Sequence, residues 1–174
     1  MPSLQKAFTW AEDKCEEPNV GYSQEYREGQ IVDGIQYYDC SSFIYAALVA
    51  GGFEFIPEYQ WFWTGNQTQA MKSVGWTEYV FQDGVISDFA LRNGDVLIRG
   101  AGRSDVPGDV STDDGHTAMV WNAAKGYTMG AHSSSLELSD QVSKHHIDQR
   151  KETWFFVMRY GDGAVPGSPS FTAA

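Results

Sequence analysis

The sequence is poor in cysteine and in positive charge. Its 174 residues include only two cysteines, Cys15 and Cys40, too few for a scaffold held together by several disulfides. Lys and Arg number 12 against 23 Asp and Glu, a formal net charge of -11, whereas a surface that binds nucleic acid has to neutralise phosphates. We therefore expect no nucleic acid partner, and each thiol needs its own explanation.

Long apolar runs are missing as well. The longest uncharged apolar stretch, residues 43–53, falls short of the ~18 residues that a membrane span needs, and the N-terminus mixes apolar with charged side chains. We expect no membrane insertion and no signal peptide. A hydrophobic content of 42% with 14% aromatic residues predicts a folded globule, and the length suits a single domain.

Helical periodicity marks three segments in the first half of the chain: residues 4–15, 43–50 and 67–74. The first follows Ser3, a favourable N-cap, and its apolar stripe includes Cys15, which we therefore place in the core. A Thr-Gly-Asn-Gln sequence at residues 64–67 predicts a capping box for the third. Residues 19–38 show neither helical nor strand periodicity and are predicted to form a long loop.

Strand-like runs follow in the second half, at residues 76–81, 96–98, 117–121, 127–131 and 154–158. Helices first and strands later predict an α+β domain, with N-terminal helices packed on an antiparallel β-sheet. The last run is apolar on both faces, which predicts an interior strand. Residues 100–114 should form an exposed excursion between strands. We place the domain at residues 1–160 and a flexible tail or linker at 161–174, where Gly, Pro and Ser are frequent.

Cys40 carries the most chemical information. It stands at the start of a predicted helix, where free N–H groups and the helix dipole favour a thiolate and so make a cysteine a better nucleophile. Polar residues flank it, with Asp39 before it and Ser41 after it. Most free cysteines, however, are small buried residues that only pack against their neighbours. The residues around Cys40 leave both interpretations open.

Two of the four histidines stand at the ends of consecutive predicted strands. His116 opens one strand and His132 closes the next, so antiparallel pairing would bring them side by side at one end of the sheet. A thiol nucleophile needs an imidazole base, and the base needs a polar group that holds its tautomer. The alternatives are two exposed strand-end histidines, or a zinc site made by this pair and a carboxylate.

The familiar cofactor motifs are absent from the sequence. It contains no His-x-x-x-His or Cys-x-x-Cys spacing, and the neighbours His145 and His146 would diverge on a helix. It also lacks the two glycine-rich motifs that bind nucleotide phosphates, Gly-x-x-x-x-Gly-Lys and Gly-x-Gly-x-x-Gly. We expect neither a metal nor any other cofactor.

Several short motifs, in this order, resemble the bacteriophage peptidoglycan hydrolase family. They are Gly-Tyr-Ser at residues 21–23, Arg-Glu-Gly at 27–29, Tyr-Asp-Cys-Ser-Ser at 38–42, Asn-Gly-Asp-Val-Leu-Ile at 93–98, Gly-His-Thr-Ala-Met-Val at 115–120 and the later strand that ends at His132. The family contains cysteine amidases and endopeptidases of endolysins and is related to NlpC-type and to cysteine, histidine-dependent amidohydrolase/peptidase domains. The resemblance covers about residues 4–160.

The resemblance implies a papain-like α+β fold and a set of catalytic residues. Cys40 would be the nucleophile, His116 the general base and then the general acid, and His132 the polar residue that orients His116. The third position varies in such families, so Asn122 and Glu137 are its alternatives.

The resemblance also implies where the substrate binds. Tyr22, Asp39 and Ser41 match positions that line the substrate cleft in NlpC-type relatives. The segment 100–114 is longer than in NlpC-type domains and closer to the phage group, which limits how far fine specificity can be carried over.

The expected activity is hydrolysis of an amide bond of bacterial peptidoglycan, with an N-acetylmuramoyl-L-alanine amidase favoured. A stem-peptide or cross-bridge endopeptidase of the same mechanism is the alternative, and a non-wall thiol protease or a non-catalytic wall-binding protein are further ones. We expect a monomer that is made in the bacterial cytoplasm and acts on the wall after release. Because chain and wall are both acidic, a separate C-terminal wall-binding module attached to the tail would help binding.

Overall fold

The computed structural model describes residues 1–111 and 115–161. The expected tail at 161–174 therefore lies outside the described residues, apart from Gly161. The helices are α1 (Leu4–Glu16), α2 (Cys40–Ala50), α3 (Gln67–Ser73), α4 (Leu138–Gln141) and a short 3-10 helix at Pro57–Tyr59. The strands are β1 (Val20–Tyr22), β2 (Ile31–Val32), β3 (Ile35–Tyr38), β4 (Trp76–Val80), β5 (Val96–Arg99), β6 (His116–Asn122), β7 (Tyr127–Ala131), β8 (Val142–His146) and β9 (Phe156–Tyr160).

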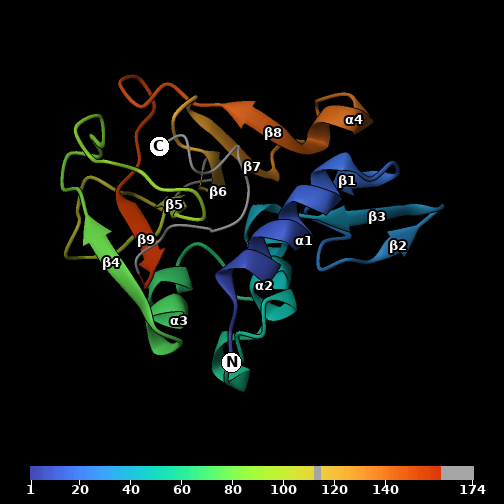
Figure 1. Ribbon diagram of the computed structural model, residues 1–174, viewed down its shortest axis with the longest axis horizontal. Coiled ribbons are helices and arrows are strands. Elements are labelled where there is room, and N and C mark those ends of the chain that lie inside the picture. Colours follow the sequence, from blue (N-terminus) through green and yellow to red (C-terminus); the bar gives the residue numbers. More distant parts are fainter. Residues whose placement is uncertain (112–114, 162–174) are drawn as a thin grey trace.

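A six-stranded antiparallel sheet in the order β4-β9-β5-β6-β7-β8 forms the centre of the molecule (Figure 1). Helices α1 and α2 pack against each other and against β6 and β7, which confirms the expected α+β arrangement. Strand β9 pairs with β4 on one side and β5 on the other, so the prediction of an interior strand is confirmed.

The two faces of the sheet are covered by different groups of side chains. The larger core lies on the α1–α2 side and includes Met119 and Met129. A smaller core on the other side contains Ala118, Val120 and Trp154. Because side chains of a strand alternate between faces, His116 belongs to the same face as Ala118 and Val120.

A capping box fixes the start of helix α2. The Asp39 carboxylate accepts a hydrogen bond from the Ser42 amide, and the Ser42 hydroxyl faces the Asp39 amide, which completes a capping box. The helix is then apolar enough to be buried between α1 and the sheet. Its first residue is Cys40, so the cap fixes the position of the thiol. Cys15, at the end of α1, is half-buried and packs against the larger core, as its place in the apolar stripe predicts.

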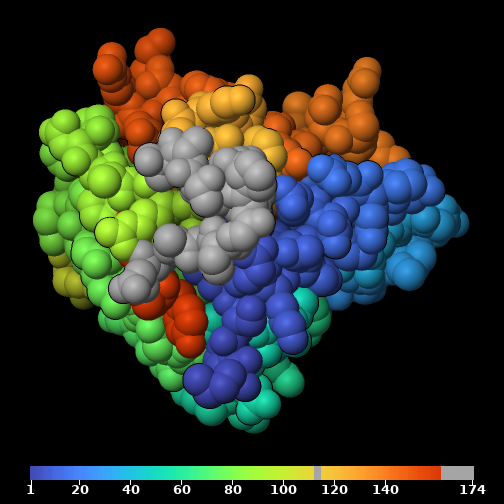
Figure 2. Space-filling view, viewed as in Figure 1, coloured from blue at the N-terminus to red at the C-terminus, as the bar shows by residue number. Residues whose placement is uncertain are grey.

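The segment 19–38 is not the predicted loop. Strands β1, β2 and β3 form a small separate sheet there, in which β1 pairs parallel with β3 and β2 antiparallel (Figure 1). Each strand has only two to four residues, too few for an alternating pattern to show in the sequence. In the space-filling view this sheet lies beside α1, on the side away from β4 (Figure 2).

Three further predictions are corrected. Strand β8 was not expected, because its Ser-Lys-His-His sequence is polar. The capping box at 64–67 does not form: Asn66 is the N-cap of α3, and its side chain accepts from the Trp63 amide instead. Residues 100–111 of the expected exposed excursion are partly buried, since the Asp109 carboxylate accepts bonds from the amides at the end of β5 and Val106 is fully buried.

Candidate active site

The Cys40 thiol lies against the backbone at the start of β6. Its sulfur is 4.0 Å from the carbonyl oxygen of Gly115, and its side chain is buried. Burial, together with the charge of Asp39, raises the pKa of Cys40 to about 11, although the amides of Thr117 and Ser41 face the sulfur and oppose the shift. The thiol is therefore protonated at neutral pH, in a site that already presents amide donors to a thiolate.

His116 and His132 lie side by side, as the pairing of their strands predicts. The strands β6 and β7 are antiparallel neighbours, and the two ring centroids are 5.5 Å apart. Burial lowers the pKa of His116 to about 3, helped by the nearby charges of His132 and Arg99. The Cys40 thiol and the His116 imidazole are thus both uncharged at neutral pH.

His132 has a defined tautomer. Its Nε2 lies 3.0 Å from the carbonyl oxygen of Ser143, and because a carbonyl only accepts, the neutral ring carries its proton on Nε2 and leaves Nδ1 as an acceptor. Burial lowers the pKa of His132 to about 4, which the Ser143 carbonyl opposes and the charge of His145 reinforces. The ring is held as a neutral hydrogen-bonding group.

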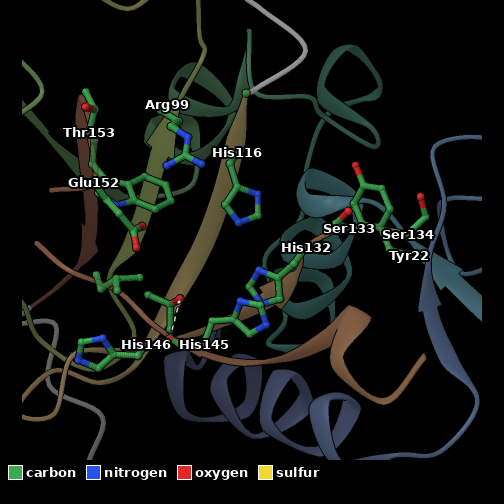
Figure 3. Close-up of a pocket in the computed structure, with 14 residues that line it drawn as sticks. Tyr22, Arg99, His116, His132, Ser133, Ser134, His145, His146, Glu152 and Thr153 are labelled. Carbon is green, nitrogen blue, oxygen red and sulfur yellow. Dashed lines mark hydrogen bonds between the residues drawn. The ribbon is translucent and has the colours of Figure 1, made fainter. Parts of the chain in front are cut away.

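His145 is a site residue that the sequence did not reveal. Its ring stacks on that of His132 with centroids 3.7 Å apart and an interplanar angle of 8°. Figure 3 shows the two rings next to each other, with His116 beyond them. Strand β8 brings His145 here by pairing it with Thr128 on β7, so only a prediction of that strand could have identified His145.

The histidines line an open cavity of about 810 Å³. Tyr22, one of the expected substrate-binding residues, also lines this cavity, together with Ser133 and Ser134 (Figure 3). Arg99 is near His116 and stacks over the Trp154 ring, with its guanidinium carbon 4.7 Å from the centroid. This cavity combines a cation, hydroxyl groups and neutral imidazoles.

The other two expected binding residues line a different hollow. Asp39 and Ser41 contribute to a cavity of about 170 Å³, together with Arg27, Glu28, Ser42, Trp61 and Trp63. The two cavities share no lining residue. Cys40 connects them, because its neighbours in the chain line the smaller one while its sulfur contacts Gly115, which lines the larger one.

The alternatives for the third residue are not brought to this place. Asn122 ends β6, six residues from His116 along the strand, and its side chain accepts a bond from the Lys125 amide. Glu137 is exposed at the N-cap of α4. Across residues 1–111 and 115–161, no three His, Cys, Asp or Glu side chains are grouped to hold a metal ion. In the same part of the chain, no helix is long and apolar enough to cross a membrane.

Comparisons with known proteins agree with the motifs. The family model described as bacteriophage peptidoglycan hydrolase matches residues 3–161, almost the whole of the described chain. A comparison with curated proteins finds no match. The family acts on the bacterial cell wall and indicates an enzyme that hydrolyses peptidoglycan. With the match extending from the first helix to the last strand, the chain belongs to the bacteriophage peptidoglycan hydrolase family.

Proposed function

We propose that the protein hydrolyses an amide bond of peptidoglycan through a covalent acyl-enzyme on Cys40, and that it is an N-acetylmuramoyl-L-alanine amidase. The supporting observation is the meeting of the capped start of α2 with the histidine end of β6 and β7. There the sulfur contacts the Gly115 carbonyl, and His116 lies beside His132. Nucleophilic acyl transfer requires a thiol, an imidazole base and a polar group that orients the base, and these observations support that assignment of roles.

In the first step the sulfur forms a bond to the carbonyl carbon while its proton passes to His116. Because the pKa of the thiol is about 11 and that of the ring about 3, the transfer accompanies the attack and no ion pair precedes it. The negative charge that develops on the carbonyl oxygen is stabilised by backbone N–H groups at the start of α2. Losing one such donor typically costs ~2.7–4 kcal/mol.

In the second step His116 returns the proton to the departing amine, and the carbon–nitrogen bond breaks. A water molecule then gives a proton to His116 as its oxygen bonds to the thioester carbon. The carbon–sulfur bond breaks, the acid product leaves, and His116 returns the proton to sulfur, which restores the thiol. In this mechanism His132 would orient His116, because its Nε2 is engaged with Ser143 and its Nδ1 is left to accept from the His116 N–H. The chemistry uses groups of this chain and one water.

The experiment is digestion of purified sacculi followed by mass spectrometry of the soluble products. Wild type should release intact stem peptides with a free N-terminal alanine, and Cys40→Ala should release none. The second cysteine supplies a matched control: Cys15→Ser lies at the far end of α1 and should keep wild-type activity. Fragments from wild type that are clipped inside the stem would contradict the amidase assignment, and equal release by Cys40→Ala would contradict the thiol mechanism.

A further inference from the structure

Two tryptophans are exposed beside the start of α2. The exposed fraction is 36% for Trp61 and 56% for Trp63, whereas Trp76 and Trp154 are almost fully buried. Tryptophan has the largest side chain and gains most from burial, so two exposed indoles lining one hollow offer a large apolar surface to a ligand.

Both indoles lie against other parts of the chain. Trp61 has a φ of 49°, a left-handed conformation that is unfavourable for a bulky residue, and its ring packs on Tyr45 with centroids 4.6 Å apart. The indole of Trp63 lies directly over Gly65, so close that any side chain at that position would collide with it. The Trp63 amide donates to the Asn66 side chain at 2.9 Å. Such contacts lower the entropy that the rings lose when a ligand binds.

Polar groups face the same hollow. A nitrogen of the half-exposed Arg27 guanidinium lies 3.7 Å from a carboxylate oxygen of Asp39, too far for a direct hydrogen bond. The pair is therefore loose enough for a ligand hydroxyl or amide to bond to both. Ser41 adds a hydroxyl to the lining. Aromatic faces next to a few convergent donors and acceptors suit a sugar ring, whose two sides are apolar and whose rim carries hydroxyl and acetamido groups.

The position of the hollow relative to Cys40 decides which part of a substrate it meets. In the proposed mechanism His116 protonates the leaving amine, so the peptide that leaves extends into the larger cavity that His116 lines. The acyl group stays bonded to sulfur and has to extend the other way. The residues there are Asp39 and Ser41, which flank Cys40 and line the smaller cavity.

We infer that the cavity lined by Arg27, Asp39, Ser41, Trp61 and Trp63 is the acyl-side subsite and binds an N-acetylated sugar that carries the lactyl group, with its ring against the indoles. This rests on the proposed function and extends it, because it explains why the scissile bond is the one that joins sugar to peptide. The small volume of this cavity, about 170 Å³, suits a single ring rather than a glycan chain.

The test compares two soluble substrates with the same scissile amide: N-acetylmuramoyl-tripeptide, and the same tripeptide capped by a lactyl group without the sugar. Release of the free N-terminal amine is measured for each. Wild type should prefer the sugar-bearing substrate ~10-fold or more in kcat/KM. Trp63→Ala should lose that preference mainly through a ~10-fold higher KM, because the sugar ring itself takes no part in bond making or breaking. Trp63→Phe should keep most of it.

Two further variants sharpen the result. Gly65→Ala keeps both indoles, but the added methyl group displaces the Trp63 ring. It should therefore reproduce the loss of sugar preference expected for Trp63→Ala. Tyr79→Leu changes an aromatic residue that is 36% exposed on β4 and lines neither cavity, and it should behave as wild type. Circular dichroism checks that each variant folds.

The possible failures are distinguishable. If folded Trp63→Ala and Gly65→Ala cleave both substrates as wild type does, the sugar subsite is wrong while the Cys40 mechanism stands. Equal cleavage of the two substrates by wild type would overturn the subsite in the same way. If Cys40→Ala is as active as wild type on the sugar-bearing substrate, the proposed function itself fails.

Discussion

At the scale of single residues, burial leaves the candidate catalytic groups uncharged. The pKa of Cys40 is raised to about 11, and those of His116 and His132 are lowered to about 3 and about 4. A neutral thiol and a neutral base are stable together at neutral pH. Their reactivity then depends on a substrate carbonyl that accepts the sulfur as the proton moves.

The two depressed histidines make stability depend on pH. Below pH 6.5 the histidines of the unfolded chain bind protons, whereas His116 and His132 in the folded chain do not until about pH 3 and 4. Stability is therefore full above pH 6.5 and falls as the pH drops. Each histidine should remove ~1.5 kcal/mol from the free energy of unfolding between pH 6.5 and 5.

Urea unfolding across this range measures the effect, before most carboxylates titrate. Replacing His132 with Gln, which keeps a donor toward Ser143, should make the pH dependence shallower. A free energy of unfolding that is the same at pH 6.5 and 5 would show that these histidines are not buried in the neutral form.

His145 offers a second test at this scale. Its charge lowers the pKa of both His132 and His116, while its ring supports His132 by stacking. His145→Phe keeps a flat ring but removes the charge, so the acid limb of the profile of kcat/KM against pH should move to higher pH. His145→Ala should lower kcat as well, because the stack is lost. An unchanged profile for the Phe variant would mean that His145 only packs.

At the scale of secondary structure, local sequence predicts the parts that hold the proposed nucleophile and its proposed base. The Asp39–Ser42 capping box and the apolar run after it are short-range signals, and they place Cys40 on the first turn of α2. The strand-like runs that become β6 and β7, with a histidine at the start of one and at the end of the next, predict that His116 and His132 lie side by side once the strands pair antiparallel. Strand β8 has no such signal: it is a polar edge strand held by pairing with β7, so His145 could not be predicted.

The contact between the first two helices depends on a glycine at the end of α2. Gly51 has an ordinary φ of -78°, but a Cβ there would lie 2.7 Å from the Ser3 carbonyl oxygen and 2.8 Å from the Ala7 Cβ. Gly51→Ala should therefore push α1 away and lower the free energy of unfolding by ~1–3 kcal/mol. Denaturant unfolding measures this change.

Gly130 provides the comparison for Gly51. A Cβ at Gly130 would meet its nearest neighbour, the Ala118 Cβ, at 3.5 Å, an ordinary contact. Gly130→Ala should cost clearly less stability than Gly51→Ala. Equal effects would show that close packing of α1 on α2 does not limit the size of residue 51.

At the scale of the whole molecule, the net charge of -11 works against an anionic wall. The composition predicts this repulsion. The sequence alone could not show that the two cavities lie on either side of Cys40, because their positions depend on how α2 packs against the sheet. A separate wall-binding module stays a proposal, because residues 162–174, where it would attach, lie outside the described residues.

Repulsion between enzyme and wall predicts an unusual salt dependence. Raising the ionic strength from 0.01 M to 0.15 M shortens the screening length from ~30 Å to ~8 Å, so digestion of sacculi by the isolated chain should accelerate several-fold. Cleavage of a small soluble muramoyl-peptide should change much less. Release rates from both substrates, measured at both salt levels, check this. Slower digestion of sacculi at higher salt would mean that enzyme and wall attract each other. The reason for proposing a separate wall-binding module would then be removed.

The most direct test of the proposed acyl-enzyme on Cys40 is to stop the reaction in acid during turnover and to measure the mass of the intact protein by mass spectrometry. With N-acetylmuramoyl-tripeptide as substrate, wild type and Cys15→Ser should both carry an added muramoyl group, and digestion should place it on Cys40. Cys40→Ala should carry none and should release no product. Product release by Cys40→Ala at the wild-type rate, or an adduct on another residue, would contradict the account.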